Sequence, residues 1–264
     1  MQTVLTPAPA TGPTREQGEE FSASGWLRWG PLLDASELTV LRSEYDRVFA
    51  AAALSGDHRN LWDEGLPPAA ARSGAQLLQI MQMCERSLPF RRLLYHERIL
   101  AVVRALIGPD VMLFHDQALF KPARTGGAIS WHQDNGYWRC SPARLISCWI
   151  TLDDVERENG AMQVISGSHQ AHAVHGKHPD TTALLQVDNI PVDAAVVIDL
   201  PAGGCMFHHC QTLHYTAPNT TDRQRRAFSI HYMPVGTRDG NGVVMQVGWS
   251  RPQLSSSHQA IQAP

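Results

Sequence analysis

The sequence predicts a core of β-strands, arranged as a sandwich or a barrel, that follows an N-terminal helical portion. Two observations carry this prediction. From Val111 onward, short segments rich in β-branched and aromatic residues alternate with clusters of Gly, Pro, Asn and Asp. Before Gly108, apolar residues instead recur at helical spacing. With 43% hydrophobic residues among 264, the chain can bury one substantial core, so we expect a single domain over residues 21–264.

The N-terminal third is expected to be a tail followed by helices. Residues 1–20 are rich in Pro, Thr, Ala and Glu and lack the cationic start and apolar run of a signal peptide, so we expect a flexible tail. A capping box over 34–37 opens a stretch of helical periodicity. A second helical stretch begins near Pro89 and stops at Gly108-Pro109. The helical portion is therefore expected over about 34–108, packed on the strands.

The rest of the chain predicts strands and gives a β core over about 111–250. Expected strands lie at 111–120, 143–152, 194–200 and 227–233. No helical segment separates them, which favours an all-β core over an alternating α/β fold.

Charge and cysteine content exclude several classes of partner. The formal net charge is −3, so nothing favours binding to nucleic acid or to a membrane surface. No apolar run approaches the roughly 20 residues of a membrane-spanning helix. The five cysteines are odd in number and lack a framework spacing, which favours reduced thiols in a cytoplasmic protein. We expect a monomer or a homodimer.

The segment from Trp131 to Trp138 carries the first chemical signal. If His132 lies at the end of a strand, Asp134 faces the same side, so an imidazole and a carboxylate can occupy neighbouring positions around a metal. A sandwich can bring His214, which lies 82 residues further on (214 − 132), to this pair. Two histidines and one carboxylate leave three positions open, as is typical of non-haem Fe(II) oxygenases. We expect these three residues to be the metal ligands and the catalytic centre.

The two histidine segments resemble those of the phytanoyl-CoA dioxygenase family of 2-oxoglutarate-dependent oxygenases. The similarity runs from about Val111 to Tyr232 and includes further pieces, namely Gln117 to Lys121, Glu158-Asn159-Gly160 and Gly167-Ser168-His169. The resemblance implies that the β core is a double-stranded β-helix, a jelly roll of cupin-like type. It also implies a small-molecule substrate.

The resemblance implies the cofactors as well: Fe(II) and 2-oxoglutarate with O₂, and ascorbate as a reductant in vitro. In the family, an arginine eleven residues after the distal histidine holds the far carboxylate of 2-oxoglutarate, and here 225 − 214 selects Arg225. A guanidinium suits this role because its planar fork meets a carboxylate in two hydrogen bonds. Thr216 matches the family's hydroxyl donor. Arg223 and Arg226 are rivals, and if the strand alternates only Arg223 shares the face of Arg225.

Other side chains are expected around the cofactor and the substrate. Gln117 and Lys121 lie four apart on one predicted strand and so share a face, which is either the pocket or the solvent side. Trp149 either walls the pocket or fills the core. We expect the residues that follow the metal pair, Asn135, Tyr137 and Trp138, to touch the substrate.

The thirteen histidines offer several alternatives. His208 and His209 compete for the third ligand position, and the resemblance makes His209 a supporting or packing residue. His115 and His231 fall in predicted strands and are expected to pack in the core. The cluster of His169, His172, His175 and His178 is a second metal site, a solvated loop or a lid over the substrate.

The resulting prediction is a dioxygenase that hydroxylates an unactivated C–H bond of a small molecule and releases succinate and CO₂. Desaturation, epoxidation and cyclisation use the same oxidant and stay open. Halogenation is disfavoured because related halogenases lack a carboxylate at the position of Asp134. The resemblance and the absence of a basic cluster for CoA phosphates beyond Arg223 to Arg226 favour a natural product over an acyl-CoA. The rivals are a metal-dependent isomerase or hydrolase and a non-oxygenase, metal-binding cupin-like protein.

Overall fold

The computed structural model describes residues 12–64, 74–258, 260–261 and 263–264. Its helices are α1 (Arg15–Ser24), α2 (Ala35–Ser55), α3 (Met83–Arg86), α4 (Leu88–Leu93), α5 (Glu97–Ile107) and α6 (Asp134–Trp138). One set of strands comprises β1 (Trp26–Trp29), β2 (Arg59–Asn60), β3 (Leu78–Met81), β4 (Val111–Lys121), β6 (Ile146–Thr151), β11 (Cys205–His209), β13 (Arg225–Pro234) and β14 (Gln253–Ser255). The others are β5 (Ile129–His132), β7 (Met162–Val164), β8 (Gly176–Lys177), β9 (Leu185–Gln186), β10 (Val196–Ile198) and β12 (His214–Thr216).

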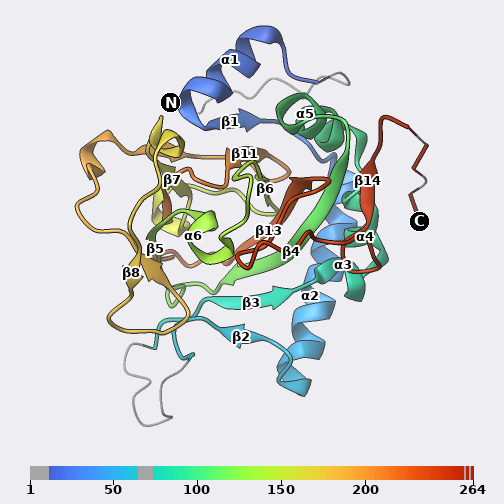
Figure 1. Cartoon of the computed structure of the whole chain (residues 1–264). Helices are drawn as coiled ribbons and strands as arrows, with labels where there is room; N and C mark the ends of the chain where they lie inside the picture. The colour runs from blue at the N-terminus through green and yellow to red at the C-terminus, as the bar shows by residue number, and fades with distance from the viewer. Residues whose placement is uncertain (1–11, 65–73, 259, 262) are drawn as a thin grey trace.

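Two antiparallel sheets form the core (Figure 1). The large sheet has the order β1-β11-β6-β13-β4-β3-β2, with β14 paired to β4, and the small sheet has the order β10-β7-β12-β5. Apolar side chains of both sheets meet in one cluster, in which Trp149 and Met206 of the large sheet pack with Met162, Val164 and Ile198 of the small one. The predicted double-stranded β-helix, with helices packed on it, is confirmed.

The helices cover the outer face of the large sheet. Helix α2 begins at Asp34, whose carboxylate accepts the backbone N–H groups of Ser36 and Glu37, while Glu37 accepts the N–H of Asp34, so the predicted capping box is present. The buried side of α2 includes Tyr45, which packs in one cluster with Phe90 of α4 and Phe228 of β13. This cover leaves the inner face of the large sheet for the cavity.

Strand alternation sends different side chains of the same strand to the two faces. Along β6, Cys148 and Ile150 pack under the helices, whereas Trp149 packs toward the small sheet. Ser147 lies on the same side as Trp149, where it contacts Asp134. The inner face therefore carries the polar residues that matter for function.

Several boundaries differ from those predicted. Of the expected tail, residues 1–11 lie outside the described residues. Residues 15–20 are helical, because a capping box between Thr14 and Gln17 stabilises the N-terminus of α1. The expected helical portion also contains β2 and β3, which are too short to show a sequence period; β3 pairs with β4, and β2 pairs with β3. A short helix, α6, interrupts the β core at Asp134. The core continues past residue 250 into β14.

Two further observations bear on the predicted setting. All five cysteines are buried and free. Within the described residues, no helix combines the length and the apolar character that crossing a membrane requires. The cytoplasmic location and the choice between monomer and homodimer stay predictions.

Candidate active site

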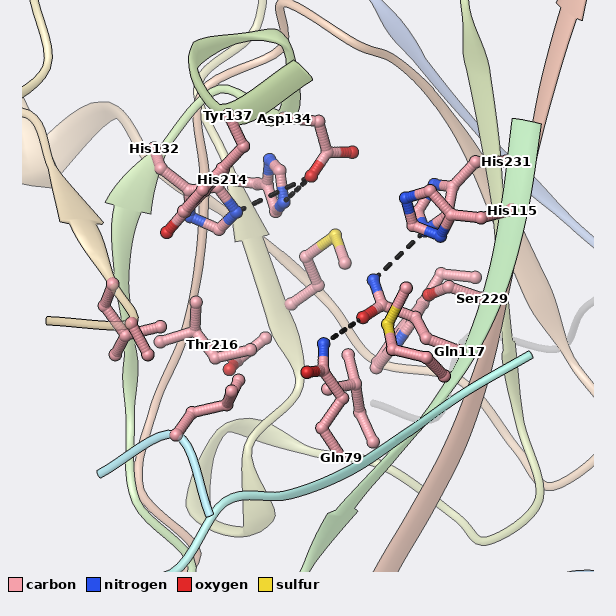
Figure 2. A pocket seen from close by; sticks show the side chains of 18 of the residues that line it. Gln79, His115, Gln117, His132, Asp134, Tyr137, His214, Thr216, Ser229 and His231 are labelled. Carbon is pink, nitrogen blue, oxygen red and sulfur yellow. Dashed lines mark hydrogen bonds and ion pairs between the residues drawn. The ribbon is translucent and has the colours of Figure 1, made fainter. Parts of the chain in front are cut away.

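The structure brings His132, Asp134 and His214 together between the two sheets (Figure 2). His132 ends β5 and pairs directly with His214, the first residue of β12, while Asp134 opens α6. The Nε2 atoms of both histidines lie 3.6 Å from Oδ1 of Asp134, and all three side chains are buried. Within the described part of the chain, no other group of three His, Cys, Asp or Glu side chains has the geometry to hold a metal.

The hydrogen bonds of the two imidazoles leave their Nε2 atoms free to bind a cation. Nδ1 of His132 lies 2.7 Å from the carbonyl oxygen of Ser130, and Nδ1 of His214 lies 2.9 Å from that of Thr212. A carbonyl only accepts, so each Nδ1 carries the proton and each Nε2 presents a lone pair toward Asp134. Three buried electron-pair donors that face one another fit a metal cation, and the backbone carbonyls fix the ring orientations.

The protonation states also suit metal ligation. Burial, followed by the neighbouring His132, lowers the pKa of His214 well below its ordinary value. Burial alone would raise the pKa of Asp134, but His214 and His132 hold it well below its usual range. At neutral pH His214 therefore offers a neutral imidazole and Asp134 a carboxylate, the forms that bind a metal.

Arg225 and Thr216 lie in the same cavity with buried polar atoms that have no partner. Arg225 is 1% exposed, and one of its NH groups donates to the carbonyl of Leu119 at 3.0 Å. Its Nε and its second terminal nitrogen have no hydrogen-bond partner, and neither does Oγ1 of Thr216. Among the described residues no carboxylate forms an ion pair with Arg225, although burial lowers its pKa only to about 10. An unpaired buried cation and a free hydroxyl fit the carboxylate of a ligand.

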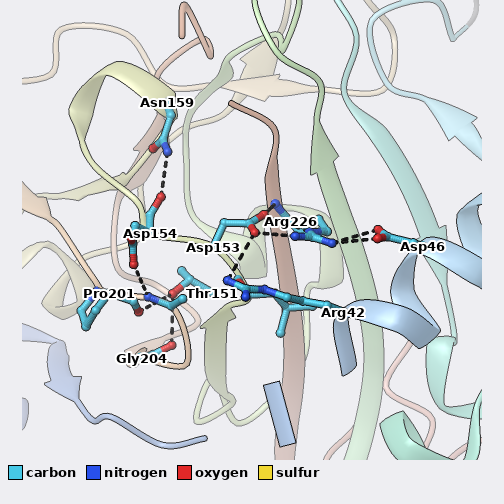
Figure 3. Close-up of polar contacts among 11 residues, drawn as sticks. Arg42, Asp46, Thr151, Asp153, Asp154, Asn159, Pro201, Gly204 and Arg226 are labelled. Atoms are coloured by element: carbon cyan, nitrogen blue, oxygen red, sulfur yellow. Dashed lines mark hydrogen bonds and ion pairs between the residues drawn. The ribbon is translucent and has the colours of Figure 1, made fainter. Parts of the chain in front are cut away.

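The two rival arginines are engaged elsewhere. Arg226 faces outward, where its guanidinium binds Asp153 at 2.7 and 3.0 Å and Asp46 at 2.9 and 3.1 Å (Figure 3). Arg223 precedes β13 and forms an exposed ion pair with Glu156. Only Arg225 of these three lines the cavity.

The cavity has a volume of about 240 Å³ and extends from the three candidate ligands to an opening beside β2 and β3. Its outer part is lined by Arg59, Leu61, Gln79, Met81, Ala183 and Leu184. Arg59 is already paired, because Glu64 accepts two of its N–H groups at 2.6 and 2.7 Å. The outer part is thus mainly apolar, and the charge that Arg59 brings to it is paired.

The structure separates the other predicted pocket residues into two groups. Gln117, Trp149, Tyr137 and Trp138 line the cavity. Lys121 does not, because its ammonium turns to the carbonyl oxygens of Thr216 and Ala217 and so fixes the backbone next to the predicted anchor. Asn135 does not either.

The side chain of Asn135 closes a turn instead. Its oxygen accepts the N–H of Cys140 at 2.8 Å, and its amide nitrogen donates to the carbonyl of the same residue at 3.3 Å. We therefore assign Asn135 to holding the turn and not to substrate contact.

The strand phase decides between the adjacent histidines 208 and 209, and it gives His209 the packing role that was one of its two expected roles. Nδ1 of His208 lies 3.9 Å from Oδ2 of Asp134 and has no hydrogen-bond partner, so His208 is the one of the two that faces the site. His209 points to the other side and packs against His169, with 5.4 Å between ring centroids. His115 and His231 are neighbours across β4 and β13, and both line the cavity in addition to packing in the sheet.

Hydrogen bonds join the histidine-rich segment, residues 169–178, to residues of the site. The backbone N–H of Gln133, between the two candidate ligands, donates to Nε2 of His175 at 2.9 Å. The side chain of Gln133 also binds the backbone of Ala171 and of Ala173. Leu185 of β9 donates its N–H to the hydroxyl of Tyr137 at 2.7 Å. Within the described residues the histidines of this segment form no metal-binding group, and Ala183 and Leu184, which follow it, line the cavity.

Comparisons with known proteins give the family. The profile of the phytanoyl-CoA dioxygenase (PhyH) family matches residues 21–227. The ectoine dioxygenase of Stutzerimonas stutzeri (strain A1501) is 26% identical in an alignment that covers 78% of this chain and 72% of that protein. The peroxisomal phytanoyl-CoA dioxygenase of Mus musculus is 23% identical, over 83% of this chain and 68% of that protein.

Solved structures agree with this assignment. The non-heme alpha ketoglutarate dependent carbocyclase SnoK from nogalamycin biosynthesis superposes with a TM-score of 0.75, at 21% identity over 95% of this chain and 100% of that one. EvdO2 from Micromonospora carbonacea var. aurantiaca, complexed with 2-oxoglutarate, has a TM-score of 0.64 at 26% identity over 89% of this chain and 94% of that one. The chain belongs to the phytanoyl-CoA dioxygenase family, whose enzymes use Fe(II) and 2-oxoglutarate with O₂.

Proposed function

We propose that this protein hydroxylates an unactivated C–H bond of an uncharged small molecule and releases succinate and CO₂. In this proposal His132, Asp134 and His214 hold Fe(II), while Arg225 and Thr216 hold the far carboxylate of 2-oxoglutarate. The observation that carries it is the set of buried, unpaired N–H and O–H groups of Arg225 and Thr216 in the cavity that also contains the three candidate ligands. A metal site alone would not need them.

The chemistry divides between the cofactors and the chain. Bound Fe(II) and 2-oxoglutarate supply the oxidation of the C–H bond by O₂. His132, Asp134 and His214 would hold Fe(II) and would leave its other coordination positions to a chelating keto acid and O₂. The buried side chains of Trp149 and Met162 line the cavity and would help to keep water from the reacting atoms.

The cavity supports a neutral substrate. Its charged groups are already engaged in this proposal: Asp134 at the metal, Arg225 at 2-oxoglutarate, and Arg59 with Glu64. A volume of about 240 Å³ must hold the co-substrate and the reacting part of the substrate, which favours a small molecule. A CoA ester is disfavoured, because Arg223 and Arg226 are paired with carboxylates.

The carboxylate of Asp134 disfavours halogenation, because it occupies the ligand position that a halide would take. Hydroxylation is distinguished from desaturation, epoxidation and cyclisation by the product. We would incubate the protein in air with Fe(II), 2-oxoglutarate and ascorbate, screen uncharged natural products for succinate release, and analyse products by mass spectrometry. The proposal predicts a product that gains one oxygen atom, derived from O₂. Loss of two hydrogen atoms instead would contradict hydroxylation, and stimulation only by acyl-CoA esters would contradict the substrate class.

A further inference from the structure

A line of hydrogen bonds crosses the inner face of the large sheet and ends on the candidate metal ligand Asp134. It joins, in order, Arg59 of β2, Gln79 of β3, Gln117 of β4, His231 of β13, Ser147 of β6 and Asp134 of α6. The first five residues come from five neighbouring strands, and Figure 2 shows the middle of the line in the cavity wall. We call these six residues the polar chain.

The register of the sheet explains why the polar chain is continuous. Arg59 and Gln79 are direct partners across β2 and β3, as are His231 and Ser147 across β13 and β6. The two steps through Gln117 join diagonal neighbours, because Gln117 itself pairs with Met81 and Ser229. Long side chains reach diagonal neighbours on one face of a sheet. The distances are 3.0, 2.5, 3.1, 2.7 and 3.0 Å from the Arg59 end to the Asp134 end.

The two ends fix the direction of every bond. A guanidinium can only donate and a carboxylate can only accept. Arg59 therefore donates to Oε1 of Gln79, and the amide nitrogen of Gln79 donates to Oε1 of Gln117. The amide nitrogen of Gln117 must then donate to Nε2 of His231, which is left without a proton.

The directions of the remaining two hydrogen bonds, from His231 to Asp134, follow in the same way. A neutral imidazole carries one proton, so that of His231 is on Nδ1 and is donated to Oγ of Ser147. The single hydroxyl proton of Ser147 then goes to Oδ2 of Asp134. The other carboxylate oxygen, Oδ1, is the one that faces Nε2 of His132 and of His214.

We propose that His231 and Ser147 are positioning residues that occupy Oδ2 of Asp134, so that the carboxylate binds the metal through Oδ1 alone, and that Gln79 and Gln117 extend this control to the mouth of the cavity. The metal part of this inference rests on the proposed function. Its protonation part does not, because it concerns His231 in the metal-free protein.

The polar chain differs from a sheet face that merely satisfies its polar groups. His115 lies beside His231, with 4.4 Å between ring centroids, yet its Nδ1 is buried without a partner. Of these two imidazoles, only that of His231, which leads to Asp134, is hydrogen-bonded on both nitrogens. Because each bond sets the next, a change at Gln79 is expected to reach His231, which Gln79 does not contact through any hydrogen bond.

The protonation of His231 is measured by ¹⁵N NMR of the metal-free protein with labelled histidine side chains. The His231→Asn variant assigns the signals. We expect a protonated Nδ1 and an unprotonated Nε2 in the wild type, and a mixture of both tautomers in Gln117→Leu and, to a smaller extent, in Gln79→Leu. A proton on Nε2 in the wild type would overturn the proposed polar chain. So would identical His231 signals in the wild type, Gln117→Leu and Gln79→Leu.

The effect on the metal site is measured as Fe(II) affinity under anaerobic conditions, by competition with a chelator. We expect Ser147→Ala to bind Fe(II) roughly 10-fold more weakly than the wild type. Ser229→Ala is the matched control, because Ser229 is also a buried serine of the inner face, outside the polar chain, and should leave the affinity unchanged. Equal affinity of Ser147→Ala and wild type overturns the inference about Asp134. Failure of the wild type itself to bind Fe(II) overturns the proposed function. In that case the NMR experiment still tests the predicted hydrogen-bond directions of the polar chain.

Discussion

His132 and His214 are direct partners across β5 and β12, with 4.1 Å between their ring centroids, although 82 residues separate them along the chain (214 − 132). This pairing places both Nε2 atoms at the same distance from one oxygen of Asp134. The register of β5 and β12 therefore positions the two histidines of the site.

The first prediction concerns these ligands. His132→Ala and His214→Ala should each weaken Fe(II) binding by roughly 100-fold or more and abolish succinate formation, since removing a ligand costs more than removing its supporting residue. Calorimetric titration with Fe(II) without oxygen, followed by succinate assay in air, measures both effects. His209→Ala is the control, because that ring packs against His169 away from the site. A loss in His209→Ala as large as in the other two would contradict the assignment.

The second prediction concerns the anchor for 2-oxoglutarate. Arg225→Met should raise the KM for 2-oxoglutarate by roughly 30-fold or more, equivalent to about 2 kcal/mol, because a buried carboxylate loses its charged partner. Thr216→Val keeps the shape but loses one hydrogen bond, so a rise of roughly 5-fold is expected. Initial rates of succinate formation at varied 2-oxoglutarate give both values. An unchanged KM in Arg225→Met would mean that another residue binds the far carboxylate of 2-oxoglutarate.

The third prediction separates the neighbouring arginines by stability. Arg226→Met should lower the free energy of unfolding by about 2 kcal/mol, since the largely buried Asp153 loses two hydrogen bonds from a guanidinium and keeps only the backbone N–H of residue 226 and the more distant Arg42. Arg223→Gln should change it by about 1 kcal/mol or less, because the Arg223–Glu156 pair is half exposed. Urea denaturation of the three proteins measures these differences. Equal stabilities of the two variants would contradict the contrast between a buried and an exposed pair.

The fourth prediction concerns pH. Burial lowers the pKa of His115 from 6.5 to about 4, so between these values the unfolded chain binds a proton that the folded protein does not. The metal-free protein should therefore lose stability as the pH falls from about 6.5 to about 4. His115 accounts for at most about 3 kcal/mol, because its ring faces the cavity.

Urea denaturation at several pH values in the presence of a chelator measures this loss. His115→Gln should show a shallower decline, although not a flat one, because burial also lowers the pKa values of His208 and His231. The exposed His172→Gln serves as the control and should follow the wild-type curve. Parallel curves for His115→Gln and the wild type would rule out this contribution.

Much of the site was predictable because its signal is local. His132 and Asp134 are two residues apart, and Arg225 and Thr216 are set by their distance from His214, so the sequence spacing suffices once the family is known. Arg225 also opens β13, a strand of ten residues that is long enough to show β character without its partners. The structure brings these five side chains to one cavity.

The rest depends on register and strand phase, which a single sequence does not contain. His208 and His209 are adjacent, and only the phase of β11 decides that His208 faces Asp134. Gln79 lies on a strand of four residues that exists by pairing with β4, and its role appears only when Gln117 lies diagonally opposite. Lys121 shares a face with Gln117, but two carbonyl groups of a neighbouring segment capture its ammonium.

The central claim is that one cavity binds Fe(II) and 2-oxoglutarate together, and its most direct test is the visible absorption spectrum without oxygen. Adding Fe(II) and 2-oxoglutarate to the metal-free protein should produce a metal-to-ligand charge-transfer band that is absent with either alone. The band should be lost in His214→Ala and should need more 2-oxoglutarate in Arg225→Met. A wild-type protein that shows no band at saturating Fe(II) and 2-oxoglutarate would contradict the account.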